Sequence, residues 1–554
     1  MTFIAAKPPR SRIKTFRIKT SVFKDFNSCT IGNAELEADV CIIGSGAAGV
    51  TLARSFGALG VRVLLLESGG TDFEDATQAL NQGASAGLPY YDLDHARLRL
   101  FGGTTNIWGG RVAELDSIDF ERRDWVPGSG WPFGEEELAP YYVRARVALE
   151  LPAMSGNTLS DFCSPFDERD LRVAFWQFDM KADRFAAGSS TDLKHLENVT
   201  CLLHATVTEL CASEGGQHIG EVRIANLRGG RGRVRAGAFV LACGALEVTR
   251  LLLASKHETH PQGMGNNNDL VGRFFMEHPH GRAAEIKLSD PKRFFEMLPR
   301  FIQRSGHRYG LLLRPGEKLQ GREGILNSGF TLAVRKPPGQ RPEIYKQVYN
   351  DLRHKLSPTV KGRALWQATR RMSILVRDRF GPHIDRNALR RGRGLYALMR
   401  AEQAPNPESR VFLGKERDAL GVPRLILDWR LSEIDKHTVA VTMRSLDREL
   451  QRLGLGSASP SSWVHDPETA WEFDPIASNH PIGGYHHMGT TRMAVTEDRG
   501  VTDGQGRVHG IANLYIASTS LFPTSGWANP TLTLLALAFR LSDHLTSSGR
   551  LDRR

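Results

Sequence analysis

The sequence of 554 residues contains no long apolar run, and this absence sets its first limits. No stretch approaches the roughly 18–20 consecutive apolar residues that a helix needs to cross a bilayer. The first twenty residues lack both the apolar core of a secretion signal and a twin-arginine pair. We therefore expect a cytoplasmic protein without membrane-spanning helices.

Cysteine is also scarce, with six residues spread along the chain. They form neither a CxxC pair nor the CxxCH sequence that attaches haem. Cys41 and Cys243 lie in apolar runs typical of strands, where cysteine usually behaves as a small hydrophobic residue. The pattern indicates neither a disulfide scaffold nor a metal site.

Acidic residues are outnumbered, and the formal charge of +11 is concentrated in two segments. Residues 1–25 hold seven Lys or Arg and one Asp, and residues 351–400 hold thirteen Lys or Arg and three Asp. Such segments are usually solvated faces. They also suit contact with an anionic surface, such as that of a membrane, an acidic partner or a phosphorylated substrate.

Apolar residues alternate with arginines in the second of these segments. The alternation suits a helix that lies on a membrane surface, and it equally suits a helix packed on its own domain. No nucleic-acid-binding module accompanies the charge, so we expect no nucleic-acid partner.

A glycine-rich loop, Gly44-Ser45-Gly46-Ala47-Ala48-Gly49, follows a predicted buried strand at 38–43 and precedes a predicted helix at 50–59. A second predicted strand, 61–66, ends at Glu67, eighteen residues after the loop. An acid in this position accepts hydrogen bonds from ribose hydroxyls and disfavours a 2′-phosphate. The order of these elements predicts a dinucleotide site, with NAD and FAD as candidates.

Each glycine of this loop has a physical role. Gly44 permits the tight turn, Gly46 lets the backbone approach a pyrophosphate, and Gly49 lets helix and strand pack closely. The helix that follows presents its unpaired N–H groups to the phosphates.

A second loop, Gly102–Arg111, contains four glycines, two threonines and an asparagine. It therefore exposes many backbone groups and can lie along a flat ring or a diphosphate. The alternative is an ordinary surface turn.

These motifs resemble those of the glucose–methanol–choline (GMC) oxidoreductases, which are FAD enzymes. The likeness rests on both loops, on Glu67-Ser68-Gly69-Gly70, on Leu241–Ala245 and on the stretch 485–533. The C-terminal pattern is closest to the branch of pyranose oxidase and related sugar dehydrogenases.

The resemblance implies an α/β fold of the GMC and p-hydroxybenzoate hydroxylase type. It combines a discontinuous, Rossmann-like FAD-binding domain with a substrate domain built on a mainly antiparallel sheet. We place the FAD-binding domain at 36–120, 190–280 and 471–554, the substrate domain at 121–189 and 281–470, and a basic N-terminal arm at 1–35. In the substrate domain, Glu402 and Gln403 either face substrate or serve the sheet.

The resemblance also implies that FAD is held by the two loops, by Glu67 and its neighbour, by a strand residue whose backbone meets the adenine, and by the C-terminal stretch. These residues are Gly44, Ser45, Gly46, Ala47, Gly49, Glu67, Ser68, Gly103, Thr104, Asn106, Trp108, Gly109, Val207, Ser518, Pro530 and Thr531. We expect no metal ion.

Two residues of the C-terminal stretch are the candidate catalytic pair. A flavin alcohol oxidoreductase needs a base for the hydroxyl proton and a polar group that holds the alcohol oxygen. In the family the base stands three residues before the Gly of a Gly-Thr pair, here Gly489, which selects His486 over His487. Asn529 takes the second place, and it equally suits the N-cap of a helix that begins at Pro530.

The resulting prediction is an FAD-dependent enzyme that oxidises the CH–OH group of a sugar, glycoside or polyol-like alcohol by hydride transfer to flavin N5, with oxygen, a quinone or a protein as electron acceptor. One alternative is a non-redox lyase of the same family, resembling the hydroxynitrile lyases. Another is a flavoprotein that acts as a binding subunit through its basic segments. Bleaching of the flavin by an alcohol without oxygen separates the first reading from the others.

Ile107 predicts how the flavin is held. Pyranose oxidases carry a His before the Trp of the second loop and bond the flavin to it, whereas Ile107 has no atom that can form this bond. We expect acid denaturation of the holoprotein to release all FAD into the supernatant, measured by its absorbance. A yellow precipitate would contradict this expectation.

Overall fold

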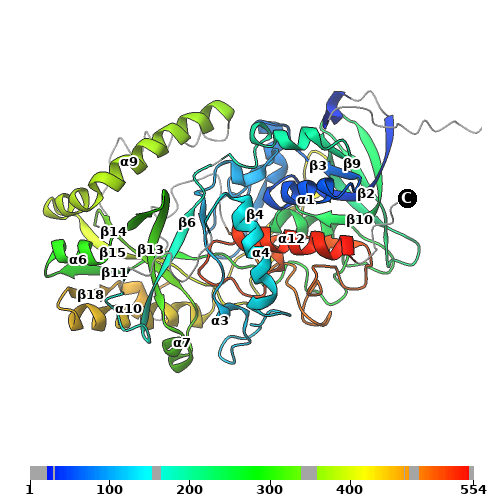
Figure 1. Ribbon diagram of the computed structural model, residues 1–554. Helices are drawn as coiled ribbons and strands as arrows, with labels where there is room; N and C mark the ends of the chain where they lie inside the picture. The colour runs from blue at the N-terminus through cyan, green and yellow to red at the C-terminus, as the bar shows by residue number, and fades with distance from the viewer. Residues whose placement is uncertain are drawn as a thin grey trace, which may run out of the picture.

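The computed structural model describes residues 22–28, 32–152, 162, 164–181, 183–337, 359–466, 468–472 and 486–547. Most of these residues belong to two large sheets and the helices packed on them, with the first sheet on the right of Figure 1 and the second on the left. Most of the expected basic arm, residues 1–21, lies outside the described residues, as does the start of the second basic segment, 351–358.

The first sheet has the strand order β1-β7-β3-β2-β10-β9-β8, with β19 beside β10. The strands are β1 (Phe23–Asp25), β2 (Gly32–Ile43), β3 (Val63–Leu66), β7 (Val199–Leu203), β8 (Thr206–Ala212), β9 (Ile219–Ala225), β10 (Arg231–Leu241) and β19 (Leu514–Ile516). All pairs are parallel except β10–β9 and β9–β8. Part of the expected N-terminal arm is therefore a strand of this sheet, β1.

Helices cover the central parallel strands, which explains why β3 is buried along its whole length. Helix α1 (Ala47–Ala58) follows β2 directly and packs against α12 (Thr531–Ser547), which in turn packs against α4 (Glu135–Ala148) (Figure 1). The apolar character of α12 is explained by this double contact, because most of its side chains are buried.

The second sheet is antiparallel throughout its described pairs and has the order β18-β11-β15-β14-β13-β6-β5, with β12 beside β13. Its strands are β5 (Arg111–Val112), β6 (Leu171–Phe178), β11 (His280–Leu288), β12 (Phe301–Arg304), β13 (His307–Pro315), β14 (Gly329–Arg335), β15 (Gly394–Arg400) and β18 (Gly456–Pro460). The amphipathic helix α10 (Glu433–Arg452) packs on β11 and β18. The predicted α/β architecture with a mainly antiparallel second sheet is confirmed.

Smaller elements complete the described part of the chain. A three-stranded sheet contains β4 (Gly83–Ser85), β16 (Arg410–Arg417) and β17 (Pro423–Asp428). The remaining α-helices are α2 (Asp75–Gln78), α3 (Ser117–Phe120), α5 (Ala245–Ala254), α6 (Pro291–Met297), α7 (Glu317–Glu323), α9 (Val360–Arg390) and α11 (Ser462–His465). None of the helices in the described part combines the length and apolarity needed to cross a membrane.

Helix α9 stands apart from the others, along one edge of the molecule at the upper left of Figure 1. It contacts α6 and β14, and few of its side chains are buried. It contains most of the described part of the second basic segment.

Candidate active site

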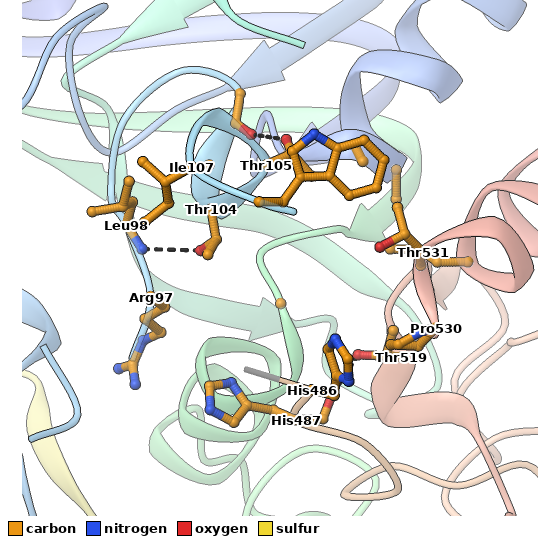
Figure 2. Close-up of a pocket in the computed structure, with 18 of the residues that line it drawn as sticks. Arg97, Leu98, Thr104, Thr105, Ile107, His486, His487, Thr519, Pro530 and Thr531 are labelled. Carbon is orange, nitrogen blue, oxygen red and sulfur yellow. Dashed lines mark hydrogen bonds between the residues drawn. The ribbon is translucent and has the colours of Figure 1, made fainter. Parts of the chain in front are cut away.

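A cavity of about 640 Å³ lies where the first sheet, the second sheet and α9 meet. Its volume is in the range of small-molecule and cofactor sites. All the expected cofactor residues line it except Gly49 and Asn106, and both His486 and Asn529 line it as well. Figure 2 shows Thr104 and Ile107 of the second loop on the opposite side of the cavity from His486 and Pro530.

Gly49 and Asn106 shape the cavity from outside its wall. A Cβ atom on Gly49 would lie 1.9 Å from the carbonyl oxygen of Gly44, so only glycine lets α1 approach the first loop. The Asn106 amide donates hydrogen bonds to the carbonyl oxygens of Phe101 and Gly103, at 3.0 and 2.8 Å. Asn106 therefore fixes the conformation of the second loop.

Glu67 joins the end of β3 to the first loop. Its carboxylate accepts hydrogen bonds from the backbone N and the hydroxyl of Ser45, at 3.1 and 2.5 Å, and from the backbone N of Gly69, at 2.8 Å. It is only 6% exposed but still lines the cavity. Free lone pairs on this buried carboxylate suit the ribose hydroxyls of a dinucleotide.

Two further observations fit a dinucleotide with a flat ring. A Cβ on Gly44 would lie 2.6 Å from the Cα of Cys243, and one on Gly103 would lie 3.4 Å from the Cα of Gly46, so the loops form a bare backbone cradle. The indole N–H of Trp108 is buried beside the cavity and has no hydrogen-bond partner among the described residues. A bound group with an acceptor atom would satisfy it.

His486 contacts one polar residue through each ring nitrogen. Its Nδ1 lies 2.9 Å from Nδ1 of His278, and its Nε2 lies 3.2 Å from the amide nitrogen of Asn529. When the amide donates to Nε2, the proton of the neutral ring is on Nδ1 and is donated to His278. Nε2 then carries no proton, its lone pair accepts the hydrogen bond from Asn529, and both residues line the cavity.

Glu277 holds the backbone of His486 in place. The backbone N of His486 lies 2.9 and 3.1 Å from its two carboxyl oxygens, and the backbone N of His278 donates to it at 2.9 Å. Tyr90 donates its hydroxyl to the same group at 2.7 Å. Burial raises the pKa of Glu277 to about 7.

Both histidines of the pair are held in the neutral form. Burial lowers the pKa of His486 well below its usual value, and the neighbouring His278 and Arg400 lower it further. Burial likewise lowers the pKa of His278 to about 4. A neutral imidazole is the form that accepts a proton.

His487, over which the sequence rule selects His486, is buried and also lines the cavity. Its Nε2 lies 2.9 Å from the hydroxyl of Tyr90, and its ring centroid lies 5.9 Å from that of Phe275. Burial lowers its pKa to about 3. These contacts tie it to the Tyr90–Glu277 pair that supports His486.

Glu402 and Gln403 serve the protein interior and do not line the cavity. Glu402 forms a buried ion pair with Arg123, with N–O distances of 2.6 and 2.9 Å. Gln403 accepts a hydrogen bond from the backbone N of Glu277 at 2.9 Å.

The sequence did not reveal the roles of Tyr90, Glu277 and His278. It also did not mark Arg111 of β5 and Arg400 of β15, which line the cavity. One local signal was present, because His278-Pro279-His280 leads directly into β11 with two histidines at strand spacing. The described residues contain no cluster of His, Cys, Asp and Glu suited to a metal ion.

Two family models and several known proteins match this chain. Residues 39–264 match the family described as FAD dependent oxidoreductase, and residues 405–538 match the family described as GMC oxidoreductase. Paromamine 6′-oxidase from Streptomyces fradiae is 24% identical, over 91% of this chain and 90% of that protein. The 2-methyl-1,2-propanediol dehydrogenase of Mycolicibacterium austroafricanum is 24% identical, over 80% of each chain.

Solved structures agree on the fold. Formate oxidase superposes with a TM-score of 0.55 at 14% identity, covering 93% of this chain and 99% of that one. An FAD-dependent oxidoreductase from Chaetomium thermophilum gives a TM-score of 0.52 at 16% identity, covering 93% of this chain and 100% of that one. Together with the family matches, the geometry of the cavity identifies its cofactor as FAD.

Proposed function

Because this chain belongs to the GMC oxidoreductases, we propose that it oxidises the CH–OH group of a sugar, glycoside or polyol-like alcohol, with His486 as the base. The observation that carries the proposal is the contact of a neutral, buried imidazole with the Asn529 amide on the wall of the FAD cavity. The relatives named above are an oxidase and a dehydrogenase, which supports an alcohol substrate with either oxygen or another acceptor.

The residues divide the chemistry among themselves. FAD, when bound, supplies the two-electron acceptor for the hydride of the alcohol carbon. His486 Nε2 takes the hydroxyl proton, and the Asn529 amide holds the alcohol oxygen beside it. His278 fixes the ring orientation and tautomer of His486 through Nδ1. Glu277 fixes the backbone from which the imidazole extends.

Replacing His486 with Ala tests the assignment. We expect FAD to stay bound while the rate of flavin bleaching by substrate, followed without oxygen in a stopped-flow instrument, falls by about 10²–10⁴, since a positioned base contributes this much. His437→Ala, which removes an exposed histidine on α10, is the matched control and keeps the original rate.

Unchanged bleaching by the His486→Ala protein would remove this residue from the mechanism. Absence of bleaching by any alcohol, together with cleavage of a hydroxynitrile, would instead establish the non-redox lyase alternative.

The pH dependence of the same reaction follows from the lowered pKa of His486. A base with a lowered pKa stays unprotonated below the usual value near 6.5, so we expect the bleaching rate to be level from about pH 6.5 upward and to fall only in more acidic buffer. The groups that disfavour its protonation are His278, His280, His487 and Arg400. A half-maximal rate at pH 6.5 or above would contradict the neutral state of this imidazole.

We further propose that α9 rests on an anionic membrane surface, which would make the protein peripheral to the membrane. Leu365, Met372, Val376 and Phe380 are exposed and follow a spacing of seven, four and four residues, so they form one apolar stripe. Met372 is 63% exposed and Leu365 is 58% exposed. Exposed apolar stripes of this kind mark interaction surfaces.

Positive charge on α9 favours an anionic lipid surface as the partner. Lys361, Arg371, Arg379 and Arg390 are exposed on the same helix. Basic side chains beside an apolar stripe bind anionic headgroups while the stripe enters the interface.

Vesicle sedimentation tests this contact. We expect the protein to bind vesicles of phosphatidylcholine mixed with phosphatidylserine, more weakly as salt rises, and not to bind phosphatidylcholine alone. A Met372→Glu, Phe380→Glu variant should lose binding, whereas Val147→Glu, which changes a 71% exposed residue on α4, should keep it. Equal binding of both variants, or no binding by the native protein, would contradict the proposal.

A further inference from the structure

We propose that the alcohol oxidised at His486 carries an anionic group, a carboxylate or a phosphate, and that Arg111 and Arg400 bind this group. The inference rests on the proposed function, because His486 brings the reacting hydroxyl to the cavity. It adds the class of substrate that the cavity selects.

The two arginines come from strands that are not neighbours in the second sheet, and both contact one aromatic ring. Arg111 opens the edge strand β5, and Arg400 closes β15. The guanidinium carbon of each lies 5.5 Å from the ring centroid of Trp176. Both side chains line the cavity.

The catalytic histidine lies close to this arginine pair. Arg400 is the cross-strand partner of His280, and its Nη1 lies 3.4 Å from Nε2 of that residue. His280 follows two residues after His278, which contacts His486 directly. A substrate with its hydroxyl at His486 therefore has its remaining groups within reach of the arginines.

Neither arginine has a carboxylate within ion-pair distance anywhere in the described part of the chain, and Nε of Arg111 is buried without a hydrogen-bond partner there. Other cavity arginines are different. Arg308 lies 3.1 Å from Asp378, and Arg99 lies 2.9 Å from Glu247. Asp378 and Glu247 thus offset the charge of Arg308 and Arg99, whereas no carboxylate in the described part of the chain pairs with Arg111 or Arg400.

Burial makes this uncompensated charge costly. It lowers the pKa of Arg111 well below its usual range, with Arg400 and Arg370 as further causes, and it lowers the pKa of Arg400 to about 10. An anion placed between two buried cations offsets this cost, which is why such pairs favour anionic ligands.

The acidic residues on the cavity wall are committed to other partners. Glu67 binds Ser45, Glu247 binds Arg99, and Glu277 binds the backbone of His486. Helix α9 adds further positive charge to the wall, since Arg370 and Arg377 line the cavity. The cavity is therefore electropositive at the end formed by the second sheet and α9.

The FAD phosphates have a separate place. They belong at the N-terminus of α1, where the first loop offers backbone N–H groups and the second loop closes over Gly46. Arg111 ends the second loop and begins β5, and Arg400 ends β15, so both side chains start from the second sheet and not from the first loop. A guanidinium group matches both carboxylate and phosphate oxygens with two parallel hydrogen bonds, so either anion suits the pair.

The test compares charged sugars with neutral counterparts on the FAD-loaded enzyme. Glucuronate is set against glucuronamide, and glucose 6-phosphate against glucose, with flavin bleaching measured without oxygen. We expect at least one charged member to show a kcat/KM about 10-fold to 100-fold above its neutral counterpart, as one hydrogen bond to a charged group provides. The two pairs also show whether carboxylate or phosphate is preferred.

Variants assign the preference to the arginines. Arg400→Gln and Arg111→Gln should each reduce the charged-to-neutral ratio about 10-fold or more, mainly through KM. Arg444→Gln, which removes an exposed arginine from α10, should leave the ratio unchanged. If a Gln variant fails to fold, the Lys variant at that position, which keeps the charge but loses the bidentate geometry, should show an intermediate ratio.

The outcomes separate the two proposals. If neutral alcohols bleach the flavin as well as their charged counterparts, the anion inference fails and the proposed oxidation stands. If no alcohol bleaches it, the proposed function fails, and calorimetric titration with glucuronate and inorganic phosphate decides the anion site by itself. Binding that Arg400→Gln abolishes supports the site, and absent or unaltered binding overturns it.

Discussion

The close approach of Gly49 to the carbonyl oxygen of Gly44 is the constraint on which the site depends. A Cβ atom there would overlap the backbone at 1.9 Å, so the first turn of α1 can press against the first loop only at glycine. This approach directs the N-terminus of α1 toward the cavity and fixes the surface on which α12 packs. The position of Pro530, just before α12, follows from that packing.

A buried polar network then joins the start of α12 to the second sheet. Trp527, two residues before Asn529, donates its indole N–H to Asp116 at 2.7 Å, and Asn327 donates to Asp116 and Asp119. The backbone N of Asn327 in turn donates to Glu402, the partner of Arg123. The segment just before Asn529 is therefore tied to residues next to the ends of β14 and β15, and a buried network of this kind tolerates little displacement.

Local patterns allowed much of this arrangement to be predicted from the sequence. The first loop and the central strands of the first sheet follow from runs of a few residues, whereas the antiparallel second sheet is implied by the resemblance to the GMC family. The fold and FAD are confirmed. His486, Asn529 and the other site residues stay predictions that the geometry supports. Glu277 and the pair Arg111 and Arg400 could not be foreseen, because their roles arise from strands brought together across hundreds of residues, with no local spacing to mark them.

Helix α9 faces the cavity through Trp366, Arg370 and Ile374 while Leu365, Met372 and Phe380 face outward. Each residue turns an α-helix by about 100°, since a turn takes 3.6 residues. Inserting or deleting one residue near the start of α9 would rotate every later side chain by that angle and exchange part of one face for the other. Unlike a surface loop, this helix therefore tolerates little change in length near its start.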